Sequence, residues 1–494
     1  MSEVERESRR ARLDALRRQG IDPYPARTGP RRAIAQVRHE LEGEDAAALD
    51  AQARNLAVAG RITSVRSFGR LRFFDLVENG ARIQASARAG EAPDAVFQLL
   101  DQLDVGDFVR VEGRVWRTRS GELTIAAEAL QLLAKSLRPL PEKWHGLADV
   151  EARFRQRYLD LLVNEEVRRV ARVRSQTVSA MRGFLDARGF LEVETPVLQP
   201  LYGGAAARPF TTHHNLYGQN LYLRISDELY LKRLIIGGID RVYEIGRNFR
   251  NEGVSRKHNP EFTMMECYQA FADYGEMMNL TQDLLQHVVA QVLEASSVTF
   301  QGKEIDFSGS WPRRTMRDAI LEAAKIDILE PEASTPEGLA RQLRRHKLAI
   351  EPQSTWGMTV DELFGKFVEP SLVQPTFITD YPLELSPLAK RKAADPRLVE
   401  RFEIFVAGME LGNAFSELND PDDQRARFEQ ARRDAKAGDE EAHPMDEDYL
   451  RALEHGMPPT GGLGIGVDRV AMVLADASSL RETILFPHLR PEHA

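Results

Sequence analysis

Five short runs in which apolar and polar residues alternate lie between residues 56 and 133 of this 494-residue chain. Glycine and other turn-forming residues separate the runs, and a two-residue period of this kind predicts β-strands with one buried face. A helical stretch at about 93–103 follows the third run. Several short strands in so few residues predict a small closed barrel, because closure leaves no unpaired edge strand.

A five-stranded barrel with a helix after its third strand is the plan of the OB-fold, which binds single-stranded nucleic acid on one face. Residues 54–88 carry seven arginines against Asp75 and Glu78. Residues 1–145 carry 24 basic and 21 acidic side chains, whereas the remainder carries 42 and 54. A polyanion partner would suit this charge, but an all-β module of unrelated function with an arginine-rich surface stays an alternative.

Pro139 and Pro141 mark a boundary, and we expect two domains, 1–145 and 146–494. The first is expected to begin with a helix at 3–19, before the barrel. The second is expected to begin with a charged helical stretch at 149–188, then to mix helices and strands, with a charged helical insertion at 422–442.

Cys267 is the only cysteine, which excludes a disulfide framework and a thiolate zinc site. No apolar run approaches the ~18 residues of a membrane span. The charged N-terminal segment has no apolar core of the kind that marks a secretory signal. We therefore expect a cytoplasmic protein without a membrane partner.

Residues 241–268 predict a β-hairpin whose polar loop has arginines at both ends, and these could hold a polyphosphate. On the return strand, the two-residue period places four side chains on one face: Phe262, Met264, Glu266 and Tyr268. That face offers an aromatic ring to a stacked base, and a carboxylate and a phenol to a cation. The alternative is an ordinary hairpin with a solvated charged loop.

Residues 401–420 contain a tight turn near Ala407 and Gly408 that would fold Glu403 back towards Glu410. Two carboxylates beside a polyphosphate are ligands that magnesium prefers, with water completing the set. The alternative is two exposed glutamates on a strand. Beyond the turn, three side chains share one face: Asn413, Phe415 and Glu417.

Two further segments are weak signals alone. A helix is expected to end at Gly189, before a strand interrupted by Pro196. In the glycine-rich segment 461–474, a helix is expected to begin near Val467, with Arg469 in its first turn, a position suited to phosphate. Its spacing matches neither a dinucleotide fingerprint nor a P-loop.

In order, these segments resemble motif 1 (about 184–198), motif 2 (about 241–270) and motif 3 (about 461–474) of the class II aminoacyl-tRNA synthetases. The OB-like domain ahead of them narrows the resemblance to the lysyl, aspartyl and asparaginyl subgroup. The segments Arg247-Asn-Phe-Arg-Asn-Glu-Gly and His258-Asn-Pro-Glu-Phe-Thr-Met-Met-Glu are similar to bacterial lysyl-tRNA synthetases in particular. The resemblance covers about residues 1–490.

This resemblance implies an α+β multidomain fold. An OB-fold anticodon-binding domain would precede a class II catalytic domain with an antiparallel sheet flanked by helices, and motif 1 would form a homodimer. The implied reaction activates L-lysine with ATP to lysyl-adenylate, releases pyrophosphate, and transfers lysine to tRNA(Lys), with Mg²⁺ as cofactor. Three alternatives remain: a paralogue that lysylates a protein or makes diadenosine polyphosphates, a nucleic-acid-binding regulator, and aspartyl or asparaginyl specificity.

The resemblance also implies a role for each site residue. Arg250 and Arg469 are expected to be catalytic, with Arg250 bridging the α-phosphate and the attacking carboxylate. The expected ATP-binding residues are Arg250, Glu252, His258, Phe262, Glu403 and Arg469. The expected magnesium ligands are Glu403 and Glu410.

The expected lysine-binding residues are Gly204, Glu228, Glu266, Tyr268, Asn413, Phe415 and Glu417. A lysine substrate has two ammonium groups, and burying either without a partner is costly. An acidic set therefore suits lysine, whereas an aspartate or asparagine enzyme would want an arginine or lysine there. By resemblance, Glu228 and the Gly204 backbone take the α-ammonium group.

In the OB-like domain, Phe73 matches an aromatic residue that stacks on an anticodon base, and Gln84 matches a hydrogen-bonding partner. Ala129 stands where the bacterial family usually has a glutamate that reads the anticodon, and Glu128 comes one position earlier. A one-residue shift on a strand reverses the face. Either the strand carries a bulge, or the contact to the third base is lost.

Overall fold

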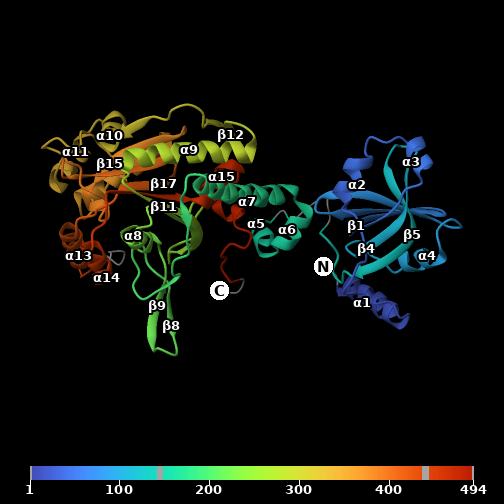
Figure 1. The fold of residues 1–494 in the computed structure, drawn as a ribbon. Coiled ribbons are helices and arrows are strands. Elements are labelled where there is room, and N and C mark those ends of the chain that lie inside the picture. The colour runs from blue at the N-terminus through green and yellow to red at the C-terminus, as the bar shows by residue number, and fades with distance from the viewer. Residues whose placement is uncertain (1–2, 142–146, 148, 437–443, 492–494) are drawn as a thin grey trace. The chain divides into compact units, whose positions relative to one another are not determined.

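In the computed structural model, the described residues are 3–141, 147, 149–436 and 444–491 (Figure 1). The chain forms two compact units: unit 1 comprises Met1–Arg153 with Tyr158–Glu165, and unit 2 comprises Phe154–Arg157 with Glu166–Ala494. The expected boundary between residues 145 and 146 lies outside the described residues. No helix in the described ranges is long and apolar enough to cross a membrane.

Unit 1 contains the predicted closed barrel, in the strand order β1-β2-β3-β5-β4. Its strands are β1 (Asn55–Phe68), β2 (Leu71–Glu78), β3 (Ala81–Arg88), β4 (Phe108–Arg117) and β5 (Leu123–Ala134). Its helices are α1 (Glu3–Arg18), α2 (Ile34–Leu41), α3 (Ala46–Gln52) and α4 (Asp94–Leu100). The helix expected at 93–103 is α4, which lies between the third and fourth strands.

Alternation along the strands separates the barrel core from its outward face. Phe74, Ile83 and Ile125 are fully buried inside the barrel, so their neighbours along each strand point outwards. Strands β4 and β5 approach closely at Gly113, where a Cβ atom would lie 1.8 Å from the Ala126 carbonyl oxygen. Only glycine fits there.

Strand β5 carries a bulge at Glu128, because Ala129 pairs with Glu112 while Ala127 pairs with Gly113. Both Glu128 and Ala129 are consequently exposed. Of the two alternatives that the sequence left open, the structure has the bulge.

Unit 2 is built on an eight-stranded sheet of order β14-β15-β16-β17-β18-β11-β10-β6. Neighbouring strands are antiparallel except at the two edges, where β14 runs parallel to β15 and β6 runs parallel to β10. The strands are β6 (Leu191–Glu192), β10 (Arg241–Phe249), β11 (Glu261–Ala270), β14 (Arg313–Thr315), β15 (Thr376–Pro382), β16 (Leu398–Val406), β17 (Met409–Ser416) and β18 (Thr460–Gly466).

Two smaller sheets accompany the large one. The first contains β7 (Leu198–Gln199), β9 (Gln219–Leu223) and β8 (Thr211–His214), and the second contains β12 (Ser297–Phe300) and β13 (Lys303–Asp306). The hairpin of β8 and β9 projects from the body of unit 2 (Figure 1).

Helices cover the large sheet, and α9 lies along it in Figure 1. The helices of this part of the chain are α8 (Glu228–Ile236), α9 (Tyr274–Leu293), α10 (Met316–Ala324), α11 (Pro336–Arg345), α12 (Trp356–Phe367), α13 (Pro421–Lys436), α14 (Glu447–Glu454), α15 (Val467–Leu474) and α16 (Leu480–Thr483). Two 3-10 turns are η1 (Glu369–Ser371) and η2 (Leu383–Leu385). Of the insertion expected at 422–442, α13 is described, and 437–442 lie outside the described residues.

The charged stretch at 149–188 is helical, as predicted, but it is divided into α5 (Val150–Arg155), α6 (Arg157–Val163) and α7 (Glu165–Asp186). Asn164 lies between α6 and α7, and its side-chain amide donates to Asp160 over 2.5 Å. After α7, Gly189 adopts the left-handed conformation expected of it, with φ of 76°.

Candidate active site

The candidate site lies on the face of the large sheet opposite its hydrophobic core. On β11, Met265 and Cys267 are fully buried in that core. The alternate residues Phe262, Glu266 and Tyr268 therefore point to the other face, as the two-residue period predicts. Strand β18 separates them from the residues of β17.

The glycines of β18 make room for this site. Gly462 pairs with Tyr268 on one side and with Phe415 on the other, and Gly464 pairs with Glu266 and Asn413. A Cβ atom at Gly462 would lie 2.0 Å from Glu417 Oε1 and 2.5 Å from Tyr268 Cε1. The glycine-rich segment thus lets side chains of two separate strands meet above a third.

Three glutamates gather here and are withdrawn from water. Glu228 is 5% exposed, Glu266 is 4% exposed and Glu417 is 2% exposed. Together with Tyr268 they form what we call the carboxylate pocket. Glu266 accepts hydrogen bonds from Ser226 Oγ over 3.0 Å and from the Tyr268 hydroxyl over 3.1 Å. The structure therefore brings together residues that lie as much as 189 positions apart in the sequence.

Burial controls the charge of these carboxyl groups. It raises the pKa of Glu266 well above its usual range, and the nearby Asp227 adds to this effect. Burial raises the pKa of Glu417 to about 8, an effect that Lys232 opposes and Glu228 reinforces. Burial likewise raises the pKa of Glu228. In the empty pocket, burial therefore favours the protonated form of these carboxyl groups, and a bound cation would favour loss of the proton.

Sequence reasoning missed Lys232, which lies one turn after Glu228 on α8. Its ammonium group is fully buried and forms ion pairs with Glu228, over 2.5 Å, and with Glu417. Burial alone would lower the pKa of Lys232, but the two carboxylates raise it above its usual value. The spacing of four between Glu228 and Lys232 is a helical pairing signal, but it does not predict burial or the contact with Glu417.

Asn413 and Phe415 lie beside the carboxylate pocket on β17. Asn413 Oδ1 accepts a hydrogen bond from Arg401 Nε over 3.0 Å, and the same guanidinium group lies 5.5 Å from the centre of the Phe415 ring. Gly204 lies at the pocket's other end, where a Cβ atom would meet Ser226 Oγ at 2.8 Å. All seven residues expected to bind lysine thus lie in or around one site.

A second group of residues, basic and aromatic, surrounds the hairpin of β10 and β11. Arg250 lies over the Phe262 ring, with 5.1 Å between guanidinium carbon and ring centre. Arg469, in the first turn of α15, donates to the Glu410 carbonyl oxygen over 2.8 Å and lies 3.4 Å from His258 Nε2. Desolvation and the charge of Arg469 lower the pKa of His258. Glu252 is exposed in the loop.

The turn expected near residue 407 is present, since Ala407 and Gly408 both have positive φ, at 56° and 70°. Glu403 lies before it and accepts hydrogen bonds from Arg401, over 2.5 Å, and from the Tyr381 hydroxyl, over 3.0 Å. Burial, reinforced by the charge of Glu410, raises the pKa of Glu403 to about 7. The charge of Arg401 opposes this rise in the pKa of Glu403.

No cluster of three or more metal-ligating side chains occurs among the residues that the structure describes. Glu403 and Glu410 are a pair only. A pair is nevertheless the usual protein contribution to a Mg²⁺ site that takes its other ligands from substrate phosphates and water.

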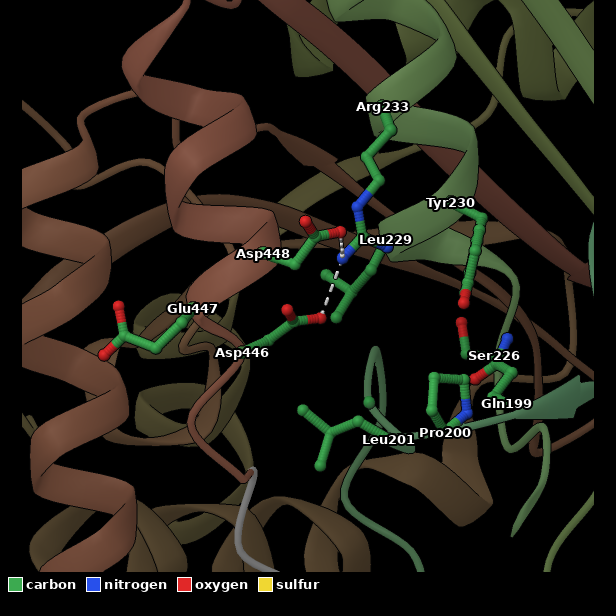
Figure 2. A pocket seen from close by; sticks show the side chains of 11 residues that line it. Gln199, Pro200, Leu201, Ser226, Leu229, Tyr230, Arg233, Asp446, Glu447 and Asp448 are labelled. Carbon is green, nitrogen blue, oxygen red and sulfur yellow. Dashed lines mark hydrogen bonds and ion pairs between the residues drawn. The ribbon is translucent and has the colours of Figure 1, made fainter. Parts of the chain in front are cut away.

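A cavity of about 230 Å³ opens beside the carboxylate pocket (Figure 2). It is lined by residues 199–201, by Gly203, and by residues of helix α8 and the start of α14. Arg233 forms ion pairs with Asp446 and Asp448 at its side. Ser226 belongs to both the cavity and the carboxylate pocket, because it lines the cavity and its hydroxyl donates to Glu266. The seven expected lysine-binding residues are not among those that line the cavity, so it adjoins the site and does not contain it.

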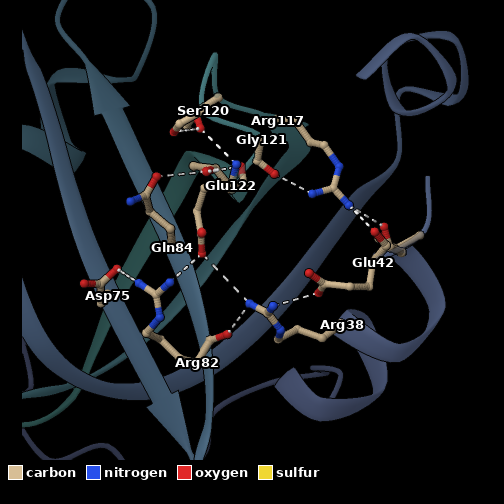
Figure 3. A network of polar contacts seen from close by, with 12 residues as sticks. Arg38, Glu42, Asp75, Arg82, Gln84, Arg117, Ser120, Gly121 and Glu122 are labelled. Atoms are coloured by element: carbon tan, nitrogen blue, oxygen red, sulfur yellow. Dashed lines mark hydrogen bonds and ion pairs between the residues drawn. The ribbon is translucent and has the colours of Figure 1, made fainter. Parts of the chain in front are cut away.

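On the outward face of the barrel, charged residues form a paired network (Figure 3). Arg82 donates to Asp75 over 3.0 Å and to Glu122 over 2.7 Å. Five of the seven arginines between 54 and 88 form ion pairs: Arg54, Arg66, Arg72, Arg82 and Arg88. The arginine-rich segment therefore carries less unpaired charge than its composition indicates.

The two expected anticodon residues lie on this outward face. Gln84 is 8% exposed, and its Oε1 accepts a hydrogen bond from the Thr124 hydroxyl over 3.0 Å. Phe73 packs edge-on against Phe68, with 6.3 Å between ring centres. In the β5 bulge, Glu128 accepts a hydrogen bond from the Asn55 side chain over 2.8 Å.

Comparisons with known proteins match this architecture. Residues 149–490 match the family described as tRNA synthetases class II (D, K and N), and residues 56–133 match the OB-fold nucleic acid binding domain. A lysine–tRNA ligase of Roseiflexus sp. (strain RS-1) is 53% identical over 487 residues, which cover 98% of each chain. A lysine–tRNA ligase of Pelotomaculum thermopropionicum is 51% identical over 486 residues, 98% of this chain and 94% of the relative.

Proposed function

Because this chain belongs to the class II tRNA synthetases, we propose that it works as a lysine–tRNA ligase. The reaction would activate L-lysine with ATP, release pyrophosphate, and pass the lysyl group to the terminal ribose hydroxyl of tRNA(Lys). Curated relatives of that name match nearly the whole chain. The observation that carries the proposal is the carboxylate pocket, since three buried glutamates suit a substrate with two ammonium groups.

In this pocket, Glu228 and the Gly204 backbone would take the α-ammonium group, with Asn413 helping to hold the α-carboxylate. Glu266, Tyr268 and Glu417 would surround the side-chain ammonium group, beside Phe415. An aspartate substrate would need a free cation here to pair with its side-chain carboxylate. Lys232 does not supply one, because its fully buried ammonium group is already paired with Glu228 and Glu417.

The ATP side would use the residues around the motif 2 hairpin. Arg250 would bridge the α-phosphate and the attacking carboxylate, where negative charge grows in the transition state. Arg469 and His258 would hold the distal phosphates, and Phe262 would stack on adenine with Glu252 at the amino group. A carboxylate is already a nucleophile, so positioning can carry this step without a general base.

Glu403 and Glu410 would hold Mg²⁺, which when bound neutralises phosphate charge and orients pyrophosphate as leaving group. Neither glutamate would act on lysine directly. Their part would be to fix the triphosphate relative to Arg250.

The barrel of unit 1 would bind the anticodon, with Phe73 stacking on a base and Gln84 hydrogen bonding to one. Exposed apolar side chains of motif 1 support a homodimer, since Leu191 is 52% exposed and Leu198 is 48% exposed. As part of the same proposal, a translation enzyme of this kind would work in the cytoplasm.

The experiment that tests this function is ATP–pyrophosphate exchange with Mg²⁺, without tRNA, run separately with all twenty amino acids. Lysine alone is expected to drive exchange. A response to aspartate or asparagine would redirect the specificity, and exchange with none of them would refute the activation step. Charging of tRNA(Lys) transcripts with altered anticodon bases then tests the barrel.

A further inference from the structure

Lys232 is a buried cation among the carboxylates of the pocket, and the proposed function does not use it. Helix α8 carries it beneath Glu228, one turn away. It is 0% exposed, so its ammonium group has lost its hydration completely. Such a group is stable only when paired, because an unpaired buried charge costs several kcal/mol.

The partners of Lys232 come from two distant segments. Glu228 lies at the start of α8, and Glu417 follows β17. Other charged or titratable groups that face this ion pair are Asp227 and Arg401 near Glu228, and Tyr449 of α14 near Lys232. Glu266 and Tyr268 of β11 face it as well. Lys232 is the cation that touches both glutamates.

Glu417 uses only one of its oxygens on this ion pair. Neither oxygen has a hydrogen-bond partner in the described parts of the chain, but Oε2 forms an ion pair with Lys232, whereas no ion pair is recorded for Oε1. Oε1 points towards Gly462, where a Cβ atom would lie 2.0 Å away. A buried carboxylate oxygen without a partner is costly, so this atom is directed at a ligand that the glycine leaves room for.

We propose that Lys232 is a positioning residue that determines specificity, because it ties the two carboxylates that hold the opposite ends of the lysine substrate. This inference rests on the proposed function. With one ammonium group bonded to both Glu228 and Glu417, the separation of the two carboxylates is fixed. The pocket then accepts a diamine of one length and rejects a shorter one.

Lys232 also sets the charge of the empty pocket. Its positive charge opposes the effect of burial on Glu228 and Glu417, and so keeps both closer to the ionised form that binds an ammonium group. Without it, burial and mutual repulsion would favour protonation of both carboxyl groups. A pocket of neutral carboxyl groups would bind lysine weakly and would select poorly for charge.

The test compares wild type with Lys232→Met, which keeps the chain length but removes the ammonium group. Exchange is measured with lysine and with ornithine, which is one methylene shorter, between pH 6.5 and 8.5. We expect the KM for lysine to rise at least 30-fold, the KM for ATP to change less than twofold, and the preference for lysine over ornithine to fall at least tenfold. The rise in KM should also shrink towards high pH.

Arg233→Met is the matched control. Arg233 is the next residue of α8, and its guanidinium group pairs with Asp446 and Asp448 outside the carboxylate pocket. This variant should keep the preference of the wild type. A purely structural role for Lys232 would lower exchange with both amino acids equally and leave the pH profile unchanged, and that result would overturn the inference.

If Lys232→Met does not fold, Lys232→Gln is used instead, because its amide can still donate a hydrogen bond to one carboxylate while the positive charge is removed. It should show the same loss of preference for lysine over ornithine, and retention of the wild-type preference would refute the inference. The wild-type arm separates the two proposals. Absence of lysine-dependent exchange in wild type would refute the proposed function itself.

Discussion

In the carboxylate pocket, three glutamates are withdrawn from water, and two of them, Glu228 and Glu417, share the ammonium group of Lys232. On the outward face of the barrel, by contrast, acidic groups such as Asp75 and Glu122 pair with arginines. Arg82, for example, forms ion pairs with both Asp75 and Glu122 (Figure 3). The pocket therefore has unmet negative charge, and the barrel face has little unmet charge of either sign. Binding in the first should depend on electrostatics, and binding in the second on stacking and shape.

Of the substitutions considered, Glu417→Gln should lower activity the most. It removes a carboxylate from the substrate and leaves Lys232 with Glu228 alone, so kcat/KM for lysine in exchange should fall on the order of 10³-fold. Glu304→Gln, at an exposed position of β13, is the control and should retain activity. Equal kinetics for the two variants would mean that Glu417 does not contact the substrate.

Gly462→Ala should come next, because its Cβ atom would overlap with Glu417 Oε1 and Tyr268. We expect kcat/KM for lysine to fall on the order of 100-fold through displacement of both side chains, while ATP binding measured by calorimetry persists. Gly183→Ala is the matched control, since nothing lies within 4 Å of its Cβ position on α7. An unchanged lysine KM in Gly462→Ala would show that the pocket relaxes around the methyl group.

Phe73→Ala should weaken tRNA binding by the barrel and leave the carboxylate pocket unaffected. Stacking of one base contributes ~1–3 kcal/mol, so the KM for tRNA in charging should rise roughly 5- to 150-fold. Lysine-dependent exchange without tRNA serves as the internal control and should not change. Normal charging of tRNA(Lys) by this variant would remove Phe73 from the anticodon site.

The smallest effect concerns pH. Because the raised pKa of Glu417, about 8, belongs to the empty pocket, and a substrate ammonium group favours the ionised form, lysine binding should release a proton. The KM for lysine should therefore fall as pH rises from 6 to 8, by up to about tenfold per unit. The lysine side chain stays charged in this range, since its pKa is about 10.4. A flat profile, measured by exchange at saturating ATP, would contradict this.

Local patterns were sufficient to predict much of this fold. Alternation predicted the barrel strands, because one face of each strand must be buried, and the Ala407–Gly408 pair predicted a turn that both residues confirm with positive φ. The face shared by Phe262, Glu266 and Tyr268 was likewise readable from a period of two. The assigned roles of the site residues came from resemblance and remain predictions.

Properties that depend on distant segments could not be read from the sequence. Lysine is usually a surface residue, and the burial of Lys232 depends on its ion pair with Glu417, which follows β17. The arginines of the barrel suggested a polyanion surface, but ion pairs with residues such as Glu44 and Asp101 neutralise several of them. The bulge at Glu128 depends on the register of β5 against β4, which no single strand reveals.

The absence of side chains at Gly462 and Gly464 of β18 limits how the amino-acid preference of this enzyme can evolve. A strand with glycine at positions 462 and 464 contributes space but no functional group, so every chemical preference of the site is encoded on the flanking segments. Those segments, α8, β11 and the end of β17, fold from separate regions of the sequence. A new amino-acid preference would thus require coordinated substitutions in at least two of them, and single mutations should more readily abolish activity than redirect it.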